Sequence, residues 1–185
     1  MAHDVCPVWI GYLLASPLRR LAHNPEKLLS PFVKPGVTVL EIGPGMGFFS
    51  LPMARMAGPA GKIVCVDVQA GMLARLKRRA QKAGLADRIE TRLCTAESLG
   101  VDDLAGRIDF ALAFAVVHEV PDAQGLFRQI HRGLRPGGTC LVSEPKGHVT
   151  PEDFRQTMSM VQGLGFDVVD RPHIRFSLSI LLKRQ

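Results

Sequence analysis

From residue 37 onward, short and continuously apolar runs alternate with longer segments that have helical spacing. The apolar runs predict strands at 37–42, 62–66, 89–94, 108–114, 139–143, 166–170 and 176–182. Helical patterns occur between them at 47–56, 70–83, 122–132 and 150–164. Continuous rather than alternating apolar strands are typical of a parallel sheet that helices cover on both faces. We therefore predict a doubly wound α/β fold with a mostly parallel, seven-stranded sheet and helices on both faces.

The last two predicted strands differ from the others in their connection. Only residues 171–175 join them, and this loop is too short for a parallel crossover. We expect one antiparallel strand near the C-terminus. A turn is expected at 134–138, where Pro136, Gly137 and Gly138 follow one another.

Residues 1–36 have a different character from the rest of the chain. Asn24, Pro25 and Glu26 form a helix-start signal, and Pro31 and Pro35 limit how far that helix can extend. We predict an N-terminal helical cap segment at 1–36 and the α/β domain at 37–185, within one structural domain overall.

Charge and cysteine content narrow the class of protein only slightly. The net charge is +6, with basic residues scattered along the sequence, which permits an anionic partner without requiring one. The 4 cysteines show neither zinc spacing nor a disulfide framework, so we expect no metal site and a reducing cytoplasm. The apolar run at 5–18 is too short for a membrane span.

A glycine-rich turn follows the first predicted strand, with Gly43, Gly45 and Gly47 at alternate positions. A dinucleotide fingerprint needs a small residue at 48, where this chain has Phe48, and no phosphate-binding Gly-Lys-Ser/Thr follows. Asp67 ends the second strand, where a carboxylate can accept hydrogen bonds from both hydroxyls of a ribose. Together these residues predict a nucleoside ligand without a pyrophosphate.

At this point the chain resembles the class I S-adenosylmethionine-dependent methyltransferases. The resemblance covers about residues 24–145 and rests on five motifs in the family's order: VLEIGPGMG (39–47), CVDVQAGML (65–73), CTAESL (94–99), IDFALAFAVVHEV (108–120) and LRPGGTCLVSEP (134–145). It implies the Rossmann-like methyltransferase fold and S-adenosyl-L-methionine as cofactor.

The resemblance also implies a set of cofactor-binding residues. Those expected to hold the methionine portion are Glu41, Gly43, Pro44, Gly45, Gly47, Phe114 and Ala115. Asp67 would bind the ribose, and the residues expected around the adenine are Val68, Met72, Thr95, Ala96 and Glu97. Thr95 departs from the Asp that is common in the family, so it is alternatively an ordinary turn residue. Glu41 is alternatively an electrostatic cap of the following helix.

Methyl transfer is an in-line displacement that needs a general base only if the acceptor holds a proton. His118, just after the fourth strand, is the catalytic candidate; alternatively it only shapes the site. The signatures of exocyclic-amine and pyrimidine carbon-5 methylation are missing after that strand, and arsenite chemistry would need several converging thiolates where Cys6 stands alone.

We therefore expect a methyltransferase acting on a small or apolar acceptor. The alternatives are a methyltransferase acting on RNA or protein and a non-catalytic module that binds S-adenosylmethionine; an NAD-dependent reductase is a distant fourth. The apolar and aromatic residues at 8–14 predict a lid over the acceptor, with packing on the sheet or a dimer contact as the alternative. We expect a monomer or homodimer.

Overall fold

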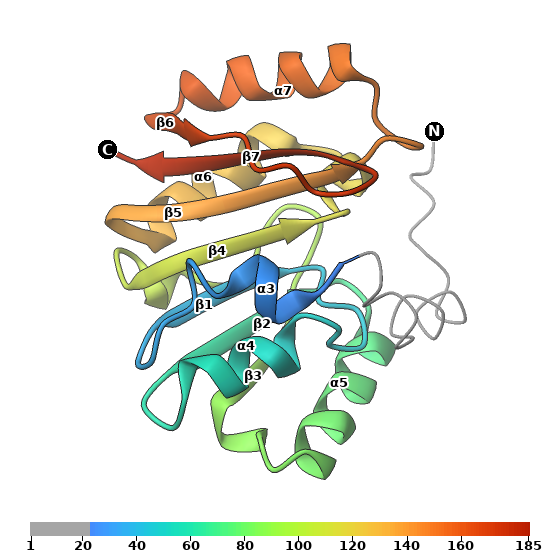
Figure 1. Ribbon diagram of the computed structural model, residues 1–185, viewed down its shortest axis with the longest axis vertical. Coiled ribbons are helices and arrows are strands. Elements are labelled where there is room, and N and C mark those ends of the chain that lie inside the picture. The colour runs from blue at the N-terminus through green and yellow to red at the C-terminus, as the bar shows by residue number, and fades with distance from the viewer. Residues whose placement is uncertain (1–22) are drawn as a thin grey trace.

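A computed structural model describes residues 23–185 of the chain (Figure 1). Its strands are β1 (Thr38–Ile42), β2 (Lys62–Asp67), β3 (Ile89–Leu93), β4 (Ile108–Phe114), β5 (Leu134–Pro145), β6 (Phe166–Asp170) and β7 (Ser177–Arg184). Its α-helices are α3 (Pro25–Leu29), α4 (Ser50–Ala57), α5 (Ala70–Lys82), α6 (Ala123–Gly133) and α7 (Pro151–Gln162). Three short 3₁₀ turns complete it: η1 (Ala86–Arg88), η2 (Asp102–Leu104) and η3 (Val117–Glu119).

The strands form one seven-stranded sheet in the order β3-β2-β1-β4-β5-β7-β6. The pairs among β1 to β5 are parallel, whereas β7 runs antiparallel to both β5 and β6 (Figure 1). The predicted sheet, with its one reversed strand beside an edge, is confirmed. The chain's winding direction changes between β1 and β4, and ligands of such sheets bind at the carboxyl ends of the strands there.

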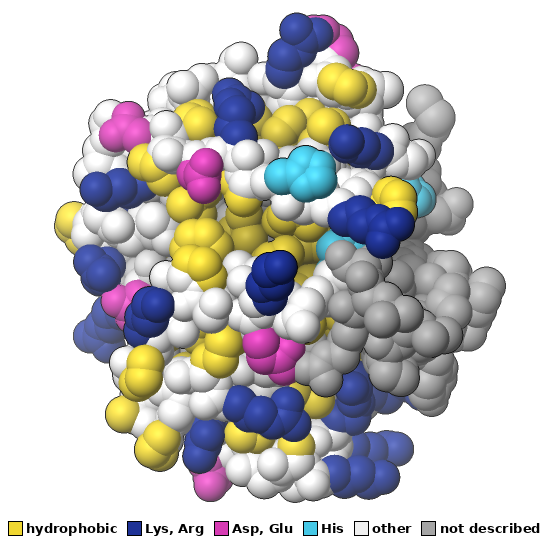
Figure 2. Space-filling model, in the orientation of Figure 1, with side chains coloured by type: hydrophobic (Ala, Val, Ile, Leu, Met, Phe, Trp, Pro, Cys, Tyr) yellow, Lys and Arg dark blue, Asp and Glu magenta, His cyan; other side chains and the backbone are white. Residues whose placement is uncertain are grey.

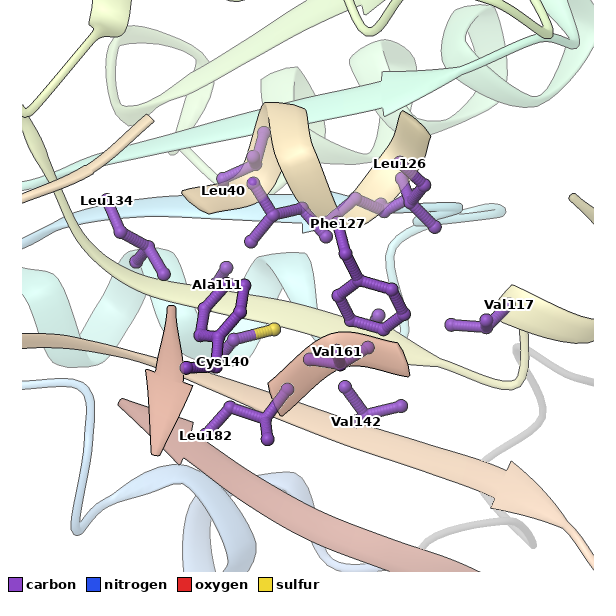
Figure 3. Packing of buried hydrophobic residues seen from close by; sticks show 14 of the residues in the cluster. Leu40, Ala111, Val117, Leu126, Phe127, Leu134, Cys140, Val142, Val161 and Leu182 are labelled. Atoms are coloured by element: carbon purple, nitrogen blue, oxygen red, sulfur yellow. The ribbon is translucent and has the colours of Figure 1, made fainter. Parts of the chain in front are cut away.

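Alternate side chains of the buried strands supply two separate apolar layers. Leu40, Ala111 and Val142 point to the face that α6 and α7 cover, where Phe127 and Val161 pack against them (Figure 3). Val39, Phe110 and Leu141 point to the opposite face, against apolar residues of α3, α4 and α5. The continuous apolar strands of the sequence are therefore buried on both faces, as expected.

The structure corrects two of the predicted elements. The helix expected at 47–56 begins at Ser50 because Gly47 has a φ of +86°, which no α-helical residue adopts. Phe48 and Phe49, expected as the start of this helix, belong to the turn. The turn expected at 134–138 is instead an irregularity within β5: Leu134 already pairs with Ile108 before the register shifts. The strand predicted at 139–143 is therefore longer and begins at Leu134, whereas the remaining strands and helices predicted from residue 37 onward agree with the structure within two residues at each end.

Side-chain caps mark the helix start predicted at Asn24 and the start of α7. The Asn24 side chain accepts a hydrogen bond from the Lys27 amide, and Pro25 stands in the first turn of α3. Thr150 caps α7 in the same way through the Asp153 amide. The predicted cap segment at 1–36 lies largely outside the described residues, as do the lid at 8–14 and Cys6. Leu29 and Val33, which are described, are buried in the core beside α4.

Charges of both signs are dispersed over the face shown in Figure 2. Several basic side chains pair with acids. For example, Glu90 pairs with Lys62 at 2.9 Å and with Arg92 at 2.7 Å, and Arg92 also pairs with Asp103 at 2.6 Å. Across residues 23–185, no helix has the length and apolar character that crossing a membrane requires.

Candidate active site at the carboxyl edge of the sheet

The glycine turn after β1 is built from three residues with positive φ: +64° at Gly43, +54° at Gly45 and +86° at Gly47. A Cβ at Gly43 would lie 2.8 Å from Cγ2 of Val116, and one at Gly47 would lie 2.4 Å from Cδ1 of Leu76. A Cβ at Gly45 would meet no atom of residues 23–185 within 4 Å. Packing therefore closes the two outer positions, whereas the central one offers open backbone that a ligand can approach.

Asp67 ends β2 directly beside this turn and is 8% exposed. Its Oδ1 accepts a hydrogen bond from the Gln69 amide at 2.9 Å, and the backbone of Gly45 and Val68 also hydrogen-bonds to the carboxylate. Burial raises the pKa of Asp67, and these backbone hydrogen bonds limit the rise. The carboxylate and the open position at Gly45 thus share one edge.

Two large apolar side chains next to Asp67 are exposed: Val68 (45%) and Leu93 (62%), which pairs with Asp67 in the β2–β3 register. A carboxylate for the two ribose hydroxyls, flanked by exposed apolar surface for a flat base, fits a nucleoside. The open backbone at Gly45 gives the remainder of such a ligand room. The residues present therefore fit S-adenosylmethionine.

The structure turns Glu41 inward. It is 2% exposed, and its Oε2 accepts hydrogen bonds from the Ser50 hydroxyl at 2.5 Å and from the Cys65 thiol at 3.6 Å. Glu41 thereby joins β1 to the first residue of α4 and to β2. Its expected contact with the methionine portion remains a prediction.

The predicted adenine edge at Thr95, Ala96 and Glu97 is exposed and follows β3. The Thr95 hydroxyl accepts hydrogen bonds from the amides of Glu97 (3.3 Å) and Ser98 (3.1 Å). Thr95 therefore organises the local turn, and its expected contact with the adenine remains a prediction. Met72, also expected near the adenine, is 3% exposed on α5.

Phe114 and Ala115 lie at the carboxyl end of β4. Phe114 packs against Phe49 with ring centroids 4.6 Å apart. Ala115 has a φ of +55°, which is rare for a residue with a side chain, and its amide donates to the Ser143 carbonyl at 2.7 Å. Such strain concentrates at functional sites, and it turns the chain from β4 into the segment that carries His118.

His118 lies in η3 beside Glu144, a residue that the sequence motifs did not single out. Glu144 is 2% exposed; its Oε1 accepts from the amides of Val116 and Val117 at 3.1 and 3.0 Å. Its Oε2 accepts from the His118 amide at 3.2 Å and contacts Nδ1 of the same residue. The hydrogen bond to Glu144 raises the pKa of His118, against the opposing effect of burial. An acid inside the apolar run TCLVSEP was the sequence signal for Glu144.

A cavity of about 200 Å³ opens beside His118, between η3, the end of β5, the loop at 146–149 and α7; we call it the η3–α7 cavity. Its apolar lining includes Val117, Val142, Val149, Phe154 and Met158. Its polar lining includes His118, Glu144, His148, Asp153 and Thr157.

One segment connects the η3–α7 cavity to the glycine turn. Val116 packs on Gly43, and the next two residues, Val117 and His118, line the cavity. The cavity therefore adjoins the same segment as the edge that carries Gly45 and Asp67, which we call the nucleoside edge.

No group of His, Cys, Asp or Glu side chains that is able to hold a metal ion occurs within residues 23–185. Cys65 and Cys140 are buried in strands and Cys94 is partly buried; all three are free thiols. Burial raises the pKa of Cys140 to about 12 and that of Cys94 to about 11, the latter with help from the Asp67 charge.

A parallel sheet with a glycine turn and a strand-end carboxylate at its switch point defines a Rossmann-like nucleoside-binding protein. Residues 33–173 match the family described as "Methyltransferase domain", and the chain belongs to that family, within the class I S-adenosylmethionine-dependent methyltransferases.

Similarity to individual proteins agrees with this membership. The chain is 35% identical over 112 residues to the ubiquinone/menaquinone biosynthesis C-methyltransferase UbiE of Hahella chejuensis, covering 60% of this chain and 44% of that protein. It is 33% identical over 121 residues to the arsenite methyltransferase of Halobacterium salinarum, covering 65% of this chain and 30% of that protein. The chain thus spans less than half the length of these two relatives.

A crystal structure of a SAM-dependent methyltransferase from Aquifex aeolicus has the same fold. The TM-score is 0.86 at 22% identity, with 98% of this chain and 100% of that one covered.

Proposed function

We propose that the chain binds S-adenosylmethionine along the edge formed by the glycine turn and Asp67, and transfers its methyl group to a small acceptor in the η3–α7 cavity. The observation that carries this proposal is the Val116 contact with Gly43, because it sets the predicted nucleoside edge and the cavity side by side. When bound, the cofactor supplies an electrophilic methyl group on a sulfonium. The protein aligns the acceptor with that methyl group and excludes water.

The binding residues follow from the geometry of the edge. Asp67 would accept hydrogen bonds from the ribose hydroxyls, and Val68 would lie against the adenine. Gly45 would give the methionine portion access to the backbone, with the strained Ala115 beside it. The raised pKa of Asp67 reflects its burial. Hydroxyl donors from a ribose would stabilise its charged form.

The acceptor is inferred from the size and lining of the cavity. A cavity of about 200 Å³ matches a molecule with a single ring, since an apolar cavity of about 150 Å³ holds benzene. The named relatives act in quinone biosynthesis and on arsenite, which are both small-molecule chemistries. In this chain, the three free thiols within residues 23–185 do not form the cluster of thiolates that arsenite would need. These thiols also support our proposal of a reducing, cytoplasmic setting.

Calorimetric titration of the full chain with S-adenosylmethionine, S-adenosylhomocysteine and NAD tests the cofactor assignment. We expect the first two to bind and NAD not to bind. Asp67→Asn removes the charge with little change in shape and is expected to weaken cofactor binding at least 10-fold, a loss of about 1.4 kcal/mol. The matched control is Asp87→Asn at an exposed carboxylate in η1, which is expected to bind normally. Undiminished binding by Asp67→Asn would contradict the ribose assignment.

A further inference from the structure

We propose that Glu144 is a positioning residue that sets His118 to take the proton from a hydroxyl group on a one-ring acceptor in the η3–α7 cavity. This inference rests on the proposed methyl-transfer function. It adds the acceptor class and a role for a residue that the sequence motifs do not single out.

The Glu144 carboxylate lies in an unusual environment. A carboxylate that is 2% exposed needs several donors to offset its desolvation. Here the amides of Val116, Val117 and His118 all point at it, at 3.0–3.2 Å. The 3₁₀ hydrogen bonds of η3 use the amides of Glu119 and Val120, so the carboxylate fixes the backbone of η3 through the three preceding amides. The position of His118 is thus set from β5, across the sheet.

The two ring nitrogens of His118 have different roles. A carboxylate accepts hydrogen bonds, so the contact between Oε2 of Glu144 and Nδ1 of His118 places the imidazole proton on Nδ1. In the neutral ring, Nε2 is then the nitrogen with a free lone pair. The ring lines the cavity, and its side chain retains 19% exposure. This is the arrangement of a general base that a third group orients.

The charged and titratable groups around the His118 ring influence its pKa. Glu144 faces His118 from β5, Glu119 adjoins it in η3, and Asp153 lies on the cavity wall at the start of α7. His148 stands with its ring centroid 5.2 Å away. Glu144 and Glu119 favour the imidazolium that forms when His118 takes a proton, and the hydrogen bond to Glu144 is the largest influence that raises the pKa of His118. Nε2 is therefore a stronger base than that of a solvated histidine.

A base in this position indicates the kind of acceptor group. A thiol ionises readily and a neutral amine has a lone pair, so neither depends on a base, whereas a hydroxyl keeps its proton at neutral pH. In the reaction, Nε2 takes the hydroxyl proton and an oxygen lone pair forms the new bond to the methyl carbon. The carbon–sulfur bond breaks, and its electron pair returns to the sulfur. His118 is left as an imidazolium that Glu144 stabilises, and it later loses its proton to water.

The cavity walls favour a ring as the carrier of that hydroxyl. Val142, Phe154 and Met158 give apolar surface, while Thr157 and His148 supply polar groups at the wall. An aliphatic polyol would leave this apolar lining without a partner. A phenol or catechol satisfies both the apolar and the polar parts.

The experiment uses the full chain with S-adenosylmethionine and compares catechol with benzenethiol as acceptors, by formation of S-adenosylhomocysteine. We expect Glu144→Gln to lower kcat for catechol about 100-fold, in the range that general base catalysis contributes. Turnover of benzenethiol should fall less than about 5-fold, because a thiol depends little on the base. Affinity for S-adenosylmethionine, measured by calorimetry, should be essentially unchanged and reports that the variant is folded. Glu152→Gln, at an exposed acid of α7, is the matched control.

A second readout does not depend on turnover. Nitrogen-15 NMR of the histidine rings, with His118 assigned by its loss in His118→Gln, reports its tautomer and pKa. We expect the proton on Nδ1 in the native chain, and a lower His118 pKa in Glu144→Gln. Because activity with catechol requires the neutral ring, its rise with pH should then shift to lower pH in Glu144→Gln.

Three results would overturn the inference: an unchanged His118 tautomer and pKa in Glu144→Gln, equal losses for both acceptors, or native activity toward benzenethiol alone. If Glu144→Gln does not fold, His118→Gln takes its place in the acceptor comparison with the same expected selectivity. Failure to bind S-adenosylmethionine would instead refute the proposed function, while the NMR result would still decide whether Glu144 sets the state of His118.

Discussion

The glycines of the turn after β1 differ in what each requires of the structure. Gly45 and Gly47 both adopt positive φ, which costs a residue with a side chain about 1–2 kcal/mol. Gly47 additionally lies against Leu76 of α5, whereas the space next to Gly45 is open. Gly47 therefore serves folding, and Gly45 has room to serve the ligand.

This difference predicts that the two alanine variants lose different properties. Gly47→Ala should lower the free energy of unfolding by about 3 kcal/mol, the sum of backbone strain and overpacking. Gly45→Ala should lower it by about 1 kcal/mol while weakening cofactor binding. Urea unfolding and calorimetric titration measure the two quantities. Equal stability losses in both variants would contradict this division.

At the scale of elements, the segment that follows η3 leads directly into a helix cap. Asp122 caps α6 by accepting a hydrogen bond from the Gly125 amide at 2.7 Å. A Cβ at 125 would lie 2.2 Å from Oδ2 of Asp122, so a side chain there would displace this cap. η3 ends at Glu119, only a few residues before the cap.

We expect Asp122→Ala to destabilise the chain by about 1 kcal/mol, because the side-chain acceptor for an otherwise unpaired amide is lost. Asp122→Asn keeps that acceptor and should retain most of the stability. The ion pair of Asp122 with Arg128, at 3.8 Å and exposed, contributes little. Thermal unfolding of both variants measures the difference, and equal losses would point to the ion pair instead of the cap.

Element boundaries also show how far the sequence alone predicts this protein. Local signals were sufficient for the strand-end position of Asp67 and for the helix start at Asn24, because these depend on neighbours in the chain. The pairing of His118 with Glu144 joins residues 26 positions apart. It depends on β4 and β5 being adjacent in the sheet, and no local sequence pattern predicts which strands are adjacent. The irregularity in β5 was missed for the same reason, since it arises from the register with β4.

At the scale of the whole molecule, the nucleoside edge exists only when the sheet is assembled. Gly45, Asp67 and Ala115 come from three connections at the carboxyl ends of β1, β2 and β4. The unfolded chain cannot bring them together. Binding of the cofactor should therefore stabilise the native state by mass action alone.

With S-adenosylmethionine at about 100 times its Kd, we expect the free energy of unfolding to rise by about 2.7 kcal/mol. For a chain of this size, that corresponds to an increase in Tm of about 5–10 °C. Differential scanning fluorimetry measures the shift, and NAD at the same concentration serves as the control ligand. A Tm that responds equally to both ligands would speak against selective binding.

The Val116 contact with Gly43 lies between two parts of the proposed site that tolerate substitutions to different degrees. On the proposed donor side, the chain uses backbone conformations that only glycine adopts freely, so few substitutions are tolerated there. On the proposed acceptor side, the wall contributed by α7 consists of side chains such as Phe154, Thr157 and Met158, each replaceable without altering the turn. A descendant of this sequence can therefore acquire a new acceptor through a few substitutions on one helix and keep its methyl donor throughout.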